Sequence, residues 1–279
     1  QLQNECHAHG VQTGLIMGDE EKNEDAPVQI ASIATLKRRN WHDLETVDWV
    51  IVDEAHREPE SYKELFKRAK KRNERTKLLG FTATPLGPNG TRLDGYKTMI
   101  EPVKNSWLVN ERFLLPTIVR SLEEPDMEGV DMSKVGEVND RVEQCTVLGN
   151  VFRELQPYRG LPTICFLPRV AYAHGFAKQA EQLGYKCHVI DASTGKTERS
   201  ETFQAFKEND ADMLISVDVL REGFDAPNAC VGVDLQPTHQ LRVHWQKVGR
   251  IKRPYEGQDN AVLLDFAGNV WRDFPHPDD

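Results

Sequence analysis

Two adjacent carboxylates, Asp53 and Glu54, are the residues of this chain whose types and spacing most clearly support chemistry. They follow an apolar run in the segment VIVDEAH, residues 50–56, and such runs are typical of fully buried parallel strands. We therefore expect the pair at the carboxyl edge of a sheet, where open α/β sheets bind ligands. There Asp53 could hold Mg²⁺ through its water shell, and Glu54 could orient or deprotonate an attacking water. The alternative is a strand followed by a solvated acidic loop, and the segment taken alone favours function only modestly.

Two threonine hydroxyls follow one strand later, at Thr82 and Thr84 in the segment LGFTATP, residues 79–85. In a nucleotide-driven protein these hydroxyls could hydrogen-bond the carboxylate loop and relay its state to a neighbouring lobe. An isolated Thr-Ala-Thr-Pro would indicate only the end of a strand and a turn. The position directly after the carboxylate strand favours the functional interpretation.

Two guanidinium groups, Arg250 and Arg253, lie in the segment HWQKVGRIKRP, residues 244–254. We expect a short helix here, which would place them on one face with Gln246 because residues three and four apart are neighbours. Guanidinium forks suit phosphate oxygens. An arginine supplied across a domain cleft can accelerate phosphoryl transfer by about 10³ to 10⁵. The alternative is a surface helix with ordinary cations, which the carboxylate strand makes less attractive.

The elements that must position these residues alternate between strand-like and helix-like segments, which predicts two doubly wound α/β domains with parallel sheets. An acidic segment with Gly and Pro separates the two series. We expect a first domain over residues 1–118, a linker over 119–137 and a second domain over 138–279. The predicted strands are residues 11–17, 28–32, 47–52, 77–81, 163–167, 186–190, 213–217, 229–233 and 261–266.

Composition restricts the class of protein. The 279 residues are 39% hydrophobic and 28% charged, which is typical of soluble globular proteins. The net charge of −9 argues against indiscriminate polyanion binding but leaves a local nucleic-acid groove open. Five cysteines without a CxxC pair predict neither disulfides nor a zinc site, and favour a reducing, intracellular compartment. Without an apolar run of about 18 residues or a signal peptide, we expect no membrane association or secretion.

Five segments together carry a resemblance to a known family. VIVDEAH, FTATP, ICFLPR, SVDVLREGFDAP and QKVGRIKRP occur in the order and approximate spacing of motifs II to VI of superfamily 2 helicases. The chain resembles the DEAD/DEAH-box group, including RecG- and UvrB-type DNA translocases and phage-type members, over residues 28–269. The resemblance implies two RecA-like domains, ATP hydrolysis at the cleft between them, ATP and Mg²⁺ as cofactors, and nucleic acid as partner, with DNA favoured over RNA.

The resemblance also implies roles for individual residues. Asp53 and Glu54 would lie at the metal, with Glu54 activating water, and His56 would contact Gln246 across the cleft. Thr82 and Thr84 would couple hydrolysis to lobe movement. The catalytic set is Asp53, Glu54, His56, Gln246, Arg250 and Arg253.

Two further sets depend on the same resemblance. Gly223 and Asp225 would lie near the nucleotide with the two arginines, which would act as arginine fingers. A strand-binding surface would include four residues that could equally be loop and cap residues: Ser32, Thr35, Arg169 and Ser216.

The glycine-rich phosphate loop of such proteins is not found in these residues. The segment STGKT, residues 193–197, has the right ending, but Ile190 stands where the loop requires a glycine. We expect a helix start there, with Thr194 or Thr197 as a cap. In the family the loop lies upstream of Gln1, so we expect an N-terminally incomplete first lobe, with a gap in its sheet and an exposed apolar flank. A missing segment or a partner would supply the loop, and the chain alone would have negligible ATPase activity.

Three functions remain open on this sequence. The first is the motor portion of an ATP-dependent nucleic-acid helicase or translocase. The second is a nonhydrolysing nucleic-acid-binding or regulatory protein that retains the two-lobe shell. The third is the motor part of a restriction or nuclease complex, which needs an additional catalytic domain. Glu54, Arg250 and Arg253 favour a motor, because a pure binding module has no evident need for all three.

Overall fold

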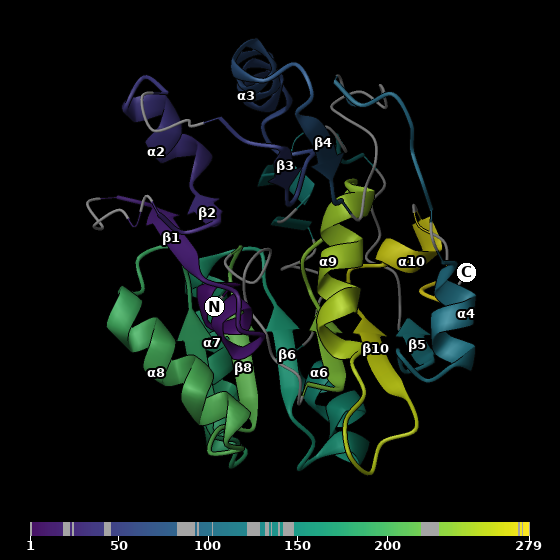
Figure 1. The fold of residues 1–279 in the computed structure, drawn as a ribbon. Coiled ribbons are helices and arrows are strands. Elements are labelled where there is room, and N and C mark those ends of the chain that lie inside the picture. Colours follow the sequence, from purple (N-terminus) through teal and green to yellow (C-terminus); the bar gives the residue numbers. More distant parts are fainter. Residues whose placement is uncertain are drawn as a thin grey trace. The chain divides into compact units, whose positions relative to one another are not determined.

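The structure, a computed structural model, divides into two compact units, residues 1–100 and 101–279. We describe each unit by itself (Figure 1). The residues that the structure describes are 2–18, 23, 25–41, 46–82, 93, 95–101, 103–121, 129–131, 134, 136–138, 140–141, 148–218, 229–272, 274 and 276–278.

The first unit contains two pairs of parallel strands, β1 with β2 and β3 with β4. The strands expected from the sequence are present, each slightly shorter than expected. A core that includes Leu36, Val52 and Phe66 joins α2 (Ile33–Arg38) and α3 (Pro59–Arg72) to the strands. The elements are α1 (Leu2–Ala8), β1 (Thr13–Ile16), β2 (Val28–Ala31), α2 (Ile33–Arg38), β3 (Trp49–Val52), α3 (Pro59–Arg72) and β4 (Lys77–Gly80).

Strand β3 is buried on one face only, which corrects the expectation of a fully buried strand. Val50 and Val52 are buried, whereas Trp49 and Ile51 are 53% and 63% exposed. No described residue joins β3–β4 to β1–β2 as one sheet, and a cavity of about 280 Å³ lies beside β3. It is lined in part by Gln29 and Ala31 of β2. The exposed apolar flank expected for this lobe is therefore present.

The second unit is a six-stranded parallel sheet in the order β5-β10-β9-β6-β8-β7. Strands β6, β8, β9 and β10 are buried along their whole length. The elements are α4 (Asn105–Asn110), β5 (Thr117–Ser121), α6 (Leu148–Leu155), a short 3₁₀ helix (Gln156–Tyr158), β6 (Thr163–Phe166), α7 (Val170–Gln182), β7 (Cys187–Ile190), α8 (Lys196–Lys207), β8 (Met213–Ser216), β9 (Val231–Asp234), α9 (Leu241–Ile251), β10 (Ala261–Asp265) and α10 (Asn269–Arg272).

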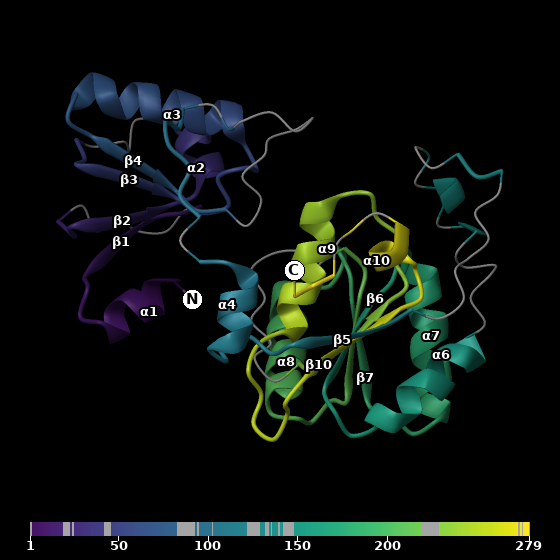
Figure 2. The same ribbon diagram turned by 90° about the vertical axis from the view of Figure 1, so that its right-hand side faces the viewer.

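Helices cover both faces of this sheet, as expected for a doubly wound domain. Phe152 of α6 and Phe176 of α7 pack against one face. Phe206 of α8 and Val248 of α9 belong to the clusters on the other face, and Figure 2 shows the two pairs of helices on opposite sides. Because all six strands are parallel, their carboxyl ends meet at one edge, where loop residues gather.

Strand β5 changes the expected division of the chain. The expected boundary after residue 118 falls inside β5, which pairs with β10 along Thr117–Ser121. This edge pairing holds the segment to the second sheet, so the division lies at residue 100 instead. Residues 119–121, expected in the linker, belong to that strand.

The segment 193–197 begins a helix, as expected, but neither threonine caps it. The N-cap residue of α8 is Gly195, with no side-chain cap hydrogen bond. The Thr194 hydroxyl instead accepts a hydrogen bond from the Asp191 N–H at 3.0 Å. Among the described residues, no helix has the length and apolar character needed to cross a bilayer.

Candidate active site

The carboxylate loop begins directly after β3. Asp53 is exposed and Glu54 is partly buried, with a left-handed backbone at φ 50°. The Glu54 N–H donates to Asp53 Oδ1 at 2.9 Å, and the Ala55 N–H donates to the Phe81 carbonyl at 2.9 Å. A left-handed residue other than Gly or Asn is uncommon and persists where its surroundings hold it, often at functional sites. The loop is therefore a shaped turn tied to the chain that follows β4.

His56 links this turn to Thr82. The imidazole is buried, with 3% of the side chain exposed, and its Nδ1 lies 2.6 Å from the Thr82 hydroxyl and 3.4 Å from Glu54 Oε2. The hydrogen bond that the sequence predicted between the segment 79–85 and the carboxylate loop is thus present at Thr82. Thr84 lies outside the described residues. The expected contact of His56 with Gln246 would join the two units, and it stays a prediction.

The two carboxylates at this turn fit a magnesium ion that is coordinated mainly by water and by substrate phosphates. Magnesium in nucleotide sites takes one or two carboxylates, several waters and the substrate phosphates. Asp53 is an exposed carboxylate at a strand end, and Glu54 follows it directly. No group of three or more His, Cys, Asp or Glu side chains in the described part of the chain could form a closed metal site.

The arginine segment lies on and after α9. Gln246 and Arg250 are partly buried and four residues apart on the helix. The helix ends at Ile251, with Lys252 as its C-cap residue, so Arg253 lies beyond it rather than on it as expected. Pro254 explains this end, because proline disfavours helical backbone in the residue before it. Burial lowers the pKa of Arg253, which nevertheless stays cationic.

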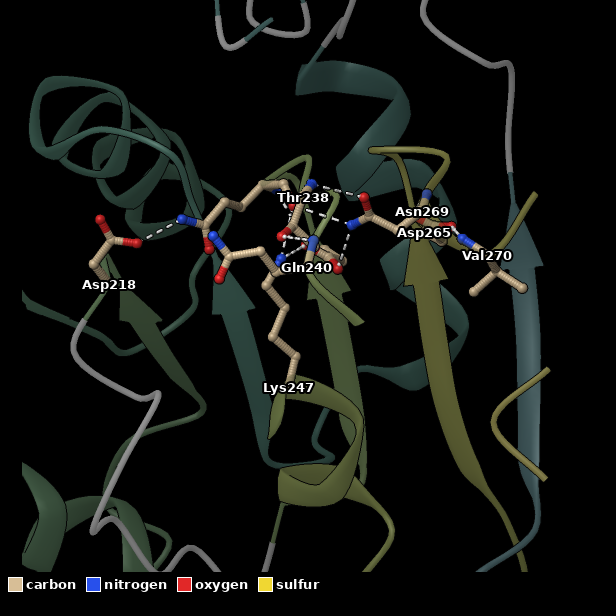
Figure 3. Close-up of polar contacts among 9 residues, drawn as sticks. Asp218, Thr238, Gln240, Lys247, Asp265, Asn269 and Val270 are labelled. Atoms are coloured by element: carbon tan, nitrogen blue, oxygen red, sulfur yellow. Dashed lines mark hydrogen bonds and ion pairs between the residues drawn. The ribbon is translucent and has the colours of Figure 1, made fainter. Parts of the chain in front are cut away.

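A buried polar cluster lies under α9, at the carboxyl ends of β9 and β10 (Figure 3). Lys247 Nζ donates to Asp234 Oδ1 at 2.7 Å and to the Gln236 carbonyl at 2.7 Å. Asn269 Nδ2 donates to Asp234 Oδ2 at 2.9 Å. Burial, and next the charge of Asp234, raise the pKa of Asp265 to about 6. The cluster fixes α9 to the edge of the sheet.

Sequence reasoning missed this cluster, although a signal for it exists. Lys247 stands in the apolar stripe of α9, one turn from Val243 and from Ile251. A lysine in such a stripe requires a buried partner, because an unpaired buried charge is costly. Strands β9 and β10 both end in aspartate, which supplies the candidates.

The C-terminal segment contacts α9 near both of its ends. The Phe274 ring stacks on His244 with centroids 4.8 Å apart. Lys252 Nζ donates to Asp278 Oδ1 and to the Pro277 carbonyl, both at 2.7 Å. The segment after α10 therefore helps to hold the helix that precedes Arg253.

Comparisons with known proteins assign the family. Residues 146–254 match the model described as Helicase conserved C-terminal domain, and residues 1–87 match that described as Type III restriction enzyme, res subunit. A 51.5 kDa protein of a Lactococcus phage is 31% identical over 205 residues, which cover 72% of this chain. IRC3 of Saccharomyces cerevisiae, described as an ATP-dependent helicase, is 24% identical over 261 residues, which cover 88% of this chain. The chain belongs to the superfamily 2 helicases. It spans 45% of the phage protein and 38% of IRC3, less than half of either.

Solved structures confirm the RecA-like fold of this superfamily 2 chain. A fragment assigned as the HsdR subunit of a type I restriction enzyme from Vibrio vulnificus has a TM-score of 0.74 at 19% identity, covering 96% of this chain and 53% of that one. Dbp5 of Saccharomyces cerevisiae, bound to RNA and ADP BeF3, has a TM-score of 0.59 at 15% identity, covering 97% and 68%. At these identities the likeness concerns the fold alone.

Two of the residues expected on the strand-binding surface of this superfamily 2 helicase are buried. Thr35 is 6% exposed, and its hydroxyl accepts a hydrogen bond from the Gly18 N–H at 3.1 Å. Ser216, at the end of β8, is 2% exposed. Thr35 lies within α2 and Ser216 ends β8, so neither is one of the loop or cap residues that the sequence left as the alternative, and their burial leaves little side-chain surface for a nucleic-acid strand.

The other two stay predicted nucleic-acid contacts. Ser32 is the partly buried N-cap residue of α2 and makes no side-chain cap hydrogen bond. Arg169 precedes α7, donates to the Gly136 carbonyl at 3.1 Å and forms an ion pair with Asp140. Gly223 and Asp225, expected near the nucleotide, lie outside the described residues.

Proposed function

We propose that this chain is the motor portion of an ATP-dependent helicase or translocase that acts on nucleic acid, with DNA favoured. The observation that carries the proposal is the carboxylate turn. It holds Glu54 in a left-handed conformation, exposes Asp53 and connects to the segment that follows β4 through the His56–Thr82 hydrogen bond. The name of IRC3 as an ATP-dependent helicase supports ATP as the fuel. The match of residues 1–87 to the res subunit model supports DNA as the track.

In this proposal the chain's residues position water and charge. Magnesium bound at Asp53 would neutralise phosphate charge. Glu54 accepts a proton from the attacking water, which general-base catalysis requires within hydrogen-bond distance. Arg250 and Arg253 supply positive charge for the transferred phosphoryl group. Thr82 senses the turn through His56 and passes its state to the rest of the motor.

We also infer that residues from the rest of a longer protein complete the first unit. The open face of β3, with Trp49 and Ile51, lies beside a cavity of about 280 Å³. An apolar segment that carries the phosphate loop would cover this face by ordinary hydrophobic burial. The 279 residues alone would then have negligible nucleic-acid-stimulated ATPase activity, and robust turnover by them would contradict this inference.

The test of the proposed function is Glu54→Gln in the full-length protein, with Glu60→Gln on the exposed face of α3 as the matched control. We expect Glu54→Gln to bind ATP and DNA with affinities within about twofold of wild type. Its turnover should fall by about 10² to 10⁴, the usual contribution of a general base. Circular dichroism should show an unchanged fold. Unchanged turnover would refute the role of Glu54, and loss of folding would indicate a structural one.

A second candidate is the motor part of a restriction complex. One observation favours it: the match of residues 1–87 to the res subunit model. The full-length protein purified with its partners should then cleave DNA in an ATP-dependent reaction. A helicase acting alone would displace strands or translocate without cutting.

A further inference from the structure

Residue Gln236 lies at the centre of the polar cluster under α9. Its N–H donates to Asp234 Oδ1 at 3.1 Å, and its carbonyl accepts from Lys247 Nζ at 2.7 Å and from Asn269 Nδ2 at 3.0 Å. With both backbone polar groups engaged and only 9% of its surface exposed, Gln236 has little freedom to move. The backbone of Gln236 therefore holds its side chain in a fixed position.

The Gln236 side chain reaches Asp218, two residues after the end of β8. Gln236 Nε2 donates to Asp218 Oδ1 at 2.6 Å, and Figure 3 shows Asp218 at the far end of this chain of contacts from Asn269. Asp218 has a left-handed backbone at φ 58°. A hydrogen bond to a carboxylate is stronger than one between neutral groups, so it is well suited to hold an unfavourable backbone conformation. Asp218 directly precedes residues 219–228, which include the predicted nucleotide residues Gly223 and Asp225.

The other end of the chain of contacts is the helix that carries Arg250. Lys247 and Asp234 are buried, with 3% and 1% of their side chains exposed. A buried charge pair of this kind is satisfied only in one geometry, because either charge left alone in the interior is strongly unfavourable. Rotation or sliding of α9 would break the Lys247 bonds to Asp234 and to Gln236 together. The register of α9 and the position of Gln236 are thus fixed by the same lysine.

We propose that Gln236 and Lys247 are positioning residues that tie the segment beginning at Asp218 to the helix carrying Arg250. The inference rests on the proposed function, because the two linked segments hold the residues predicted to act on ATP. Neither positioning residue contacts the nucleotide in this account. Each acts by keeping Asp218 and the arginine helix in one arrangement, which matters because misplacement by about 1 Å can cost on the order of 100-fold in rate.

The first test is Gln236→Leu in the full-length protein. This change removes the bond to Asp218 and leaves the backbone contacts of residue 236 in place. The control is Gln204→Leu on α8, an exposed glutamine that also donates to a carboxylate, that of Glu208. We expect Gln236→Leu to lower kcat for nucleic-acid-stimulated ATP hydrolysis by about 10- to 100-fold. The KM for ATP and the Tm should stay near wild type, and the control should behave as wild type.

The second test removes the buried pair as a unit, with Lys247→Met and Asp234→Asn combined. Neither member of the pair is then left as an unpaired charge, so the fold should survive, while the link from α9 to Gln236 is lost. We expect kcat to fall about as far as in Gln236→Leu. Adding Gln236→Leu to this double variant should lower kcat little further, since residues that act through one network are not additive.

The outcomes separate this inference from the proposed function. If the full-length wild-type protein shows no nucleic-acid-stimulated ATPase activity, the proposed function fails. If wild type turns over and Gln236→Leu retains its kcat, the positioning role is refuted. It is also refuted if kcat falls only in proportion to Tm or if only KM rises. The same holds if the effects of Gln236→Leu and of the double variant on kcat multiply when the changes are combined.

Discussion

The substitution His244→Phe gives the most direct test of how α9 is buried. His244 is fully buried, and neither ring nitrogen has a hydrogen-bond partner among the described residues. Burial lowers its pKa to about 4 from 6.5; the charge of Lys247 also lowers it, and Asp234 opposes the change. Phenylalanine keeps an aromatic ring against Phe274 but cannot take a proton. The variant therefore isolates the free energy of protonating this site.

The sign and size follow from the two pKa values. Because the folded pKa lies below the unfolded one, protonation favours the unfolded state. The contribution of neutral His244 to the stability of wild type is complete above pH 6.5 and is lost as the pH falls towards 4. One pH unit of pKa difference corresponds to about 1.4 kcal/mol, so the full loss is about 3 kcal/mol. Most of it, about 2.5 kcal/mol, should be present at pH 4.5 and almost none at pH 7.

When wild type is measured by itself, the titration of Asp265 offsets the loss of stability due to His244. Its pKa is raised to about 6 from 3.8, so its protonation favours the folded state, and stability rises as the pH falls from 6 towards 4. The two effects are similar in size and opposite in sign. Only the difference between wild type and His244→Phe at each pH isolates the histidine.

Hydrogen exchange of peptides from β9 and α9, followed by mass spectrometry, would report the unfolding free energy of the second unit alone. Relative to wild type, His244→Phe should gain about 2.5 kcal/mol of stability between pH 7 and pH 4.5. The control is His188→Phe on β7, an exposed histidine, which should show no such gain. A difference for His244→Phe that is equal at the two pH values would refute the claim that this histidine is buried and neutral.

Two further predictions concern other contacts. Asp278→Ala should lower the unfolding free energy of the second unit by about 2 kcal/mol near pH 7, because buried Lys252 loses a charged partner. Burial raises the pKa of Asp278, but the hydrogen bonds from Lys252 and from the Thr117 N–H outweigh it and hold the pKa below 3.8. The loss of unfolding free energy in Asp278→Ala, measured by urea titration, should therefore shrink below about pH 4. A loss that stays constant with pH would contradict the pairing. Thr82→Val should cost about 1 kcal/mol by leaving buried His56 without this hydroxyl. In the full-length protein it should reduce strand displacement per ATP hydrolysed more than ATP turnover itself, and an equal reduction of both would argue against coupling through Thr82.

Local sequence was sufficient for every described strand except β5, and it nominated the candidate residues. Strands β6, β8 and β9 were expected from short apolar runs, because a strand buried on both faces has few polar residues. Asp53 and Glu54 were placed at the end of a strand by the same pattern. The hydrogen bond of Thr82 to the carboxylate turn was also predictable, since neighbouring parallel strands bring their carboxyl ends together.

Other features depend on contacts between distant residues, which local patterns do not contain. The exposure of Trp49 and Ile51 depends on what covers β3, not on the apolar run itself. The membership of β5 in the second sheet depends on pairing with β10, more than 140 residues later. The sequence placed residues 119–121 in a linker, because a local pattern does not show that the edge of a distant sheet will accept the segment as a strand.

The sequence by itself determined two α/β series and the order of motifs that identifies a superfamily 2 helicase. Only the tertiary structure decided that Lys247 is buried against Asp234 and that Gln236 links α9 to Asp218. The physical reason is that hydrophobic periodicity is set by near neighbours along the chain, whereas the partner of a buried charge is chosen by the packing of separate elements. Local sequence predicts a solvated lysine, whereas the packing of separate elements buries Lys247.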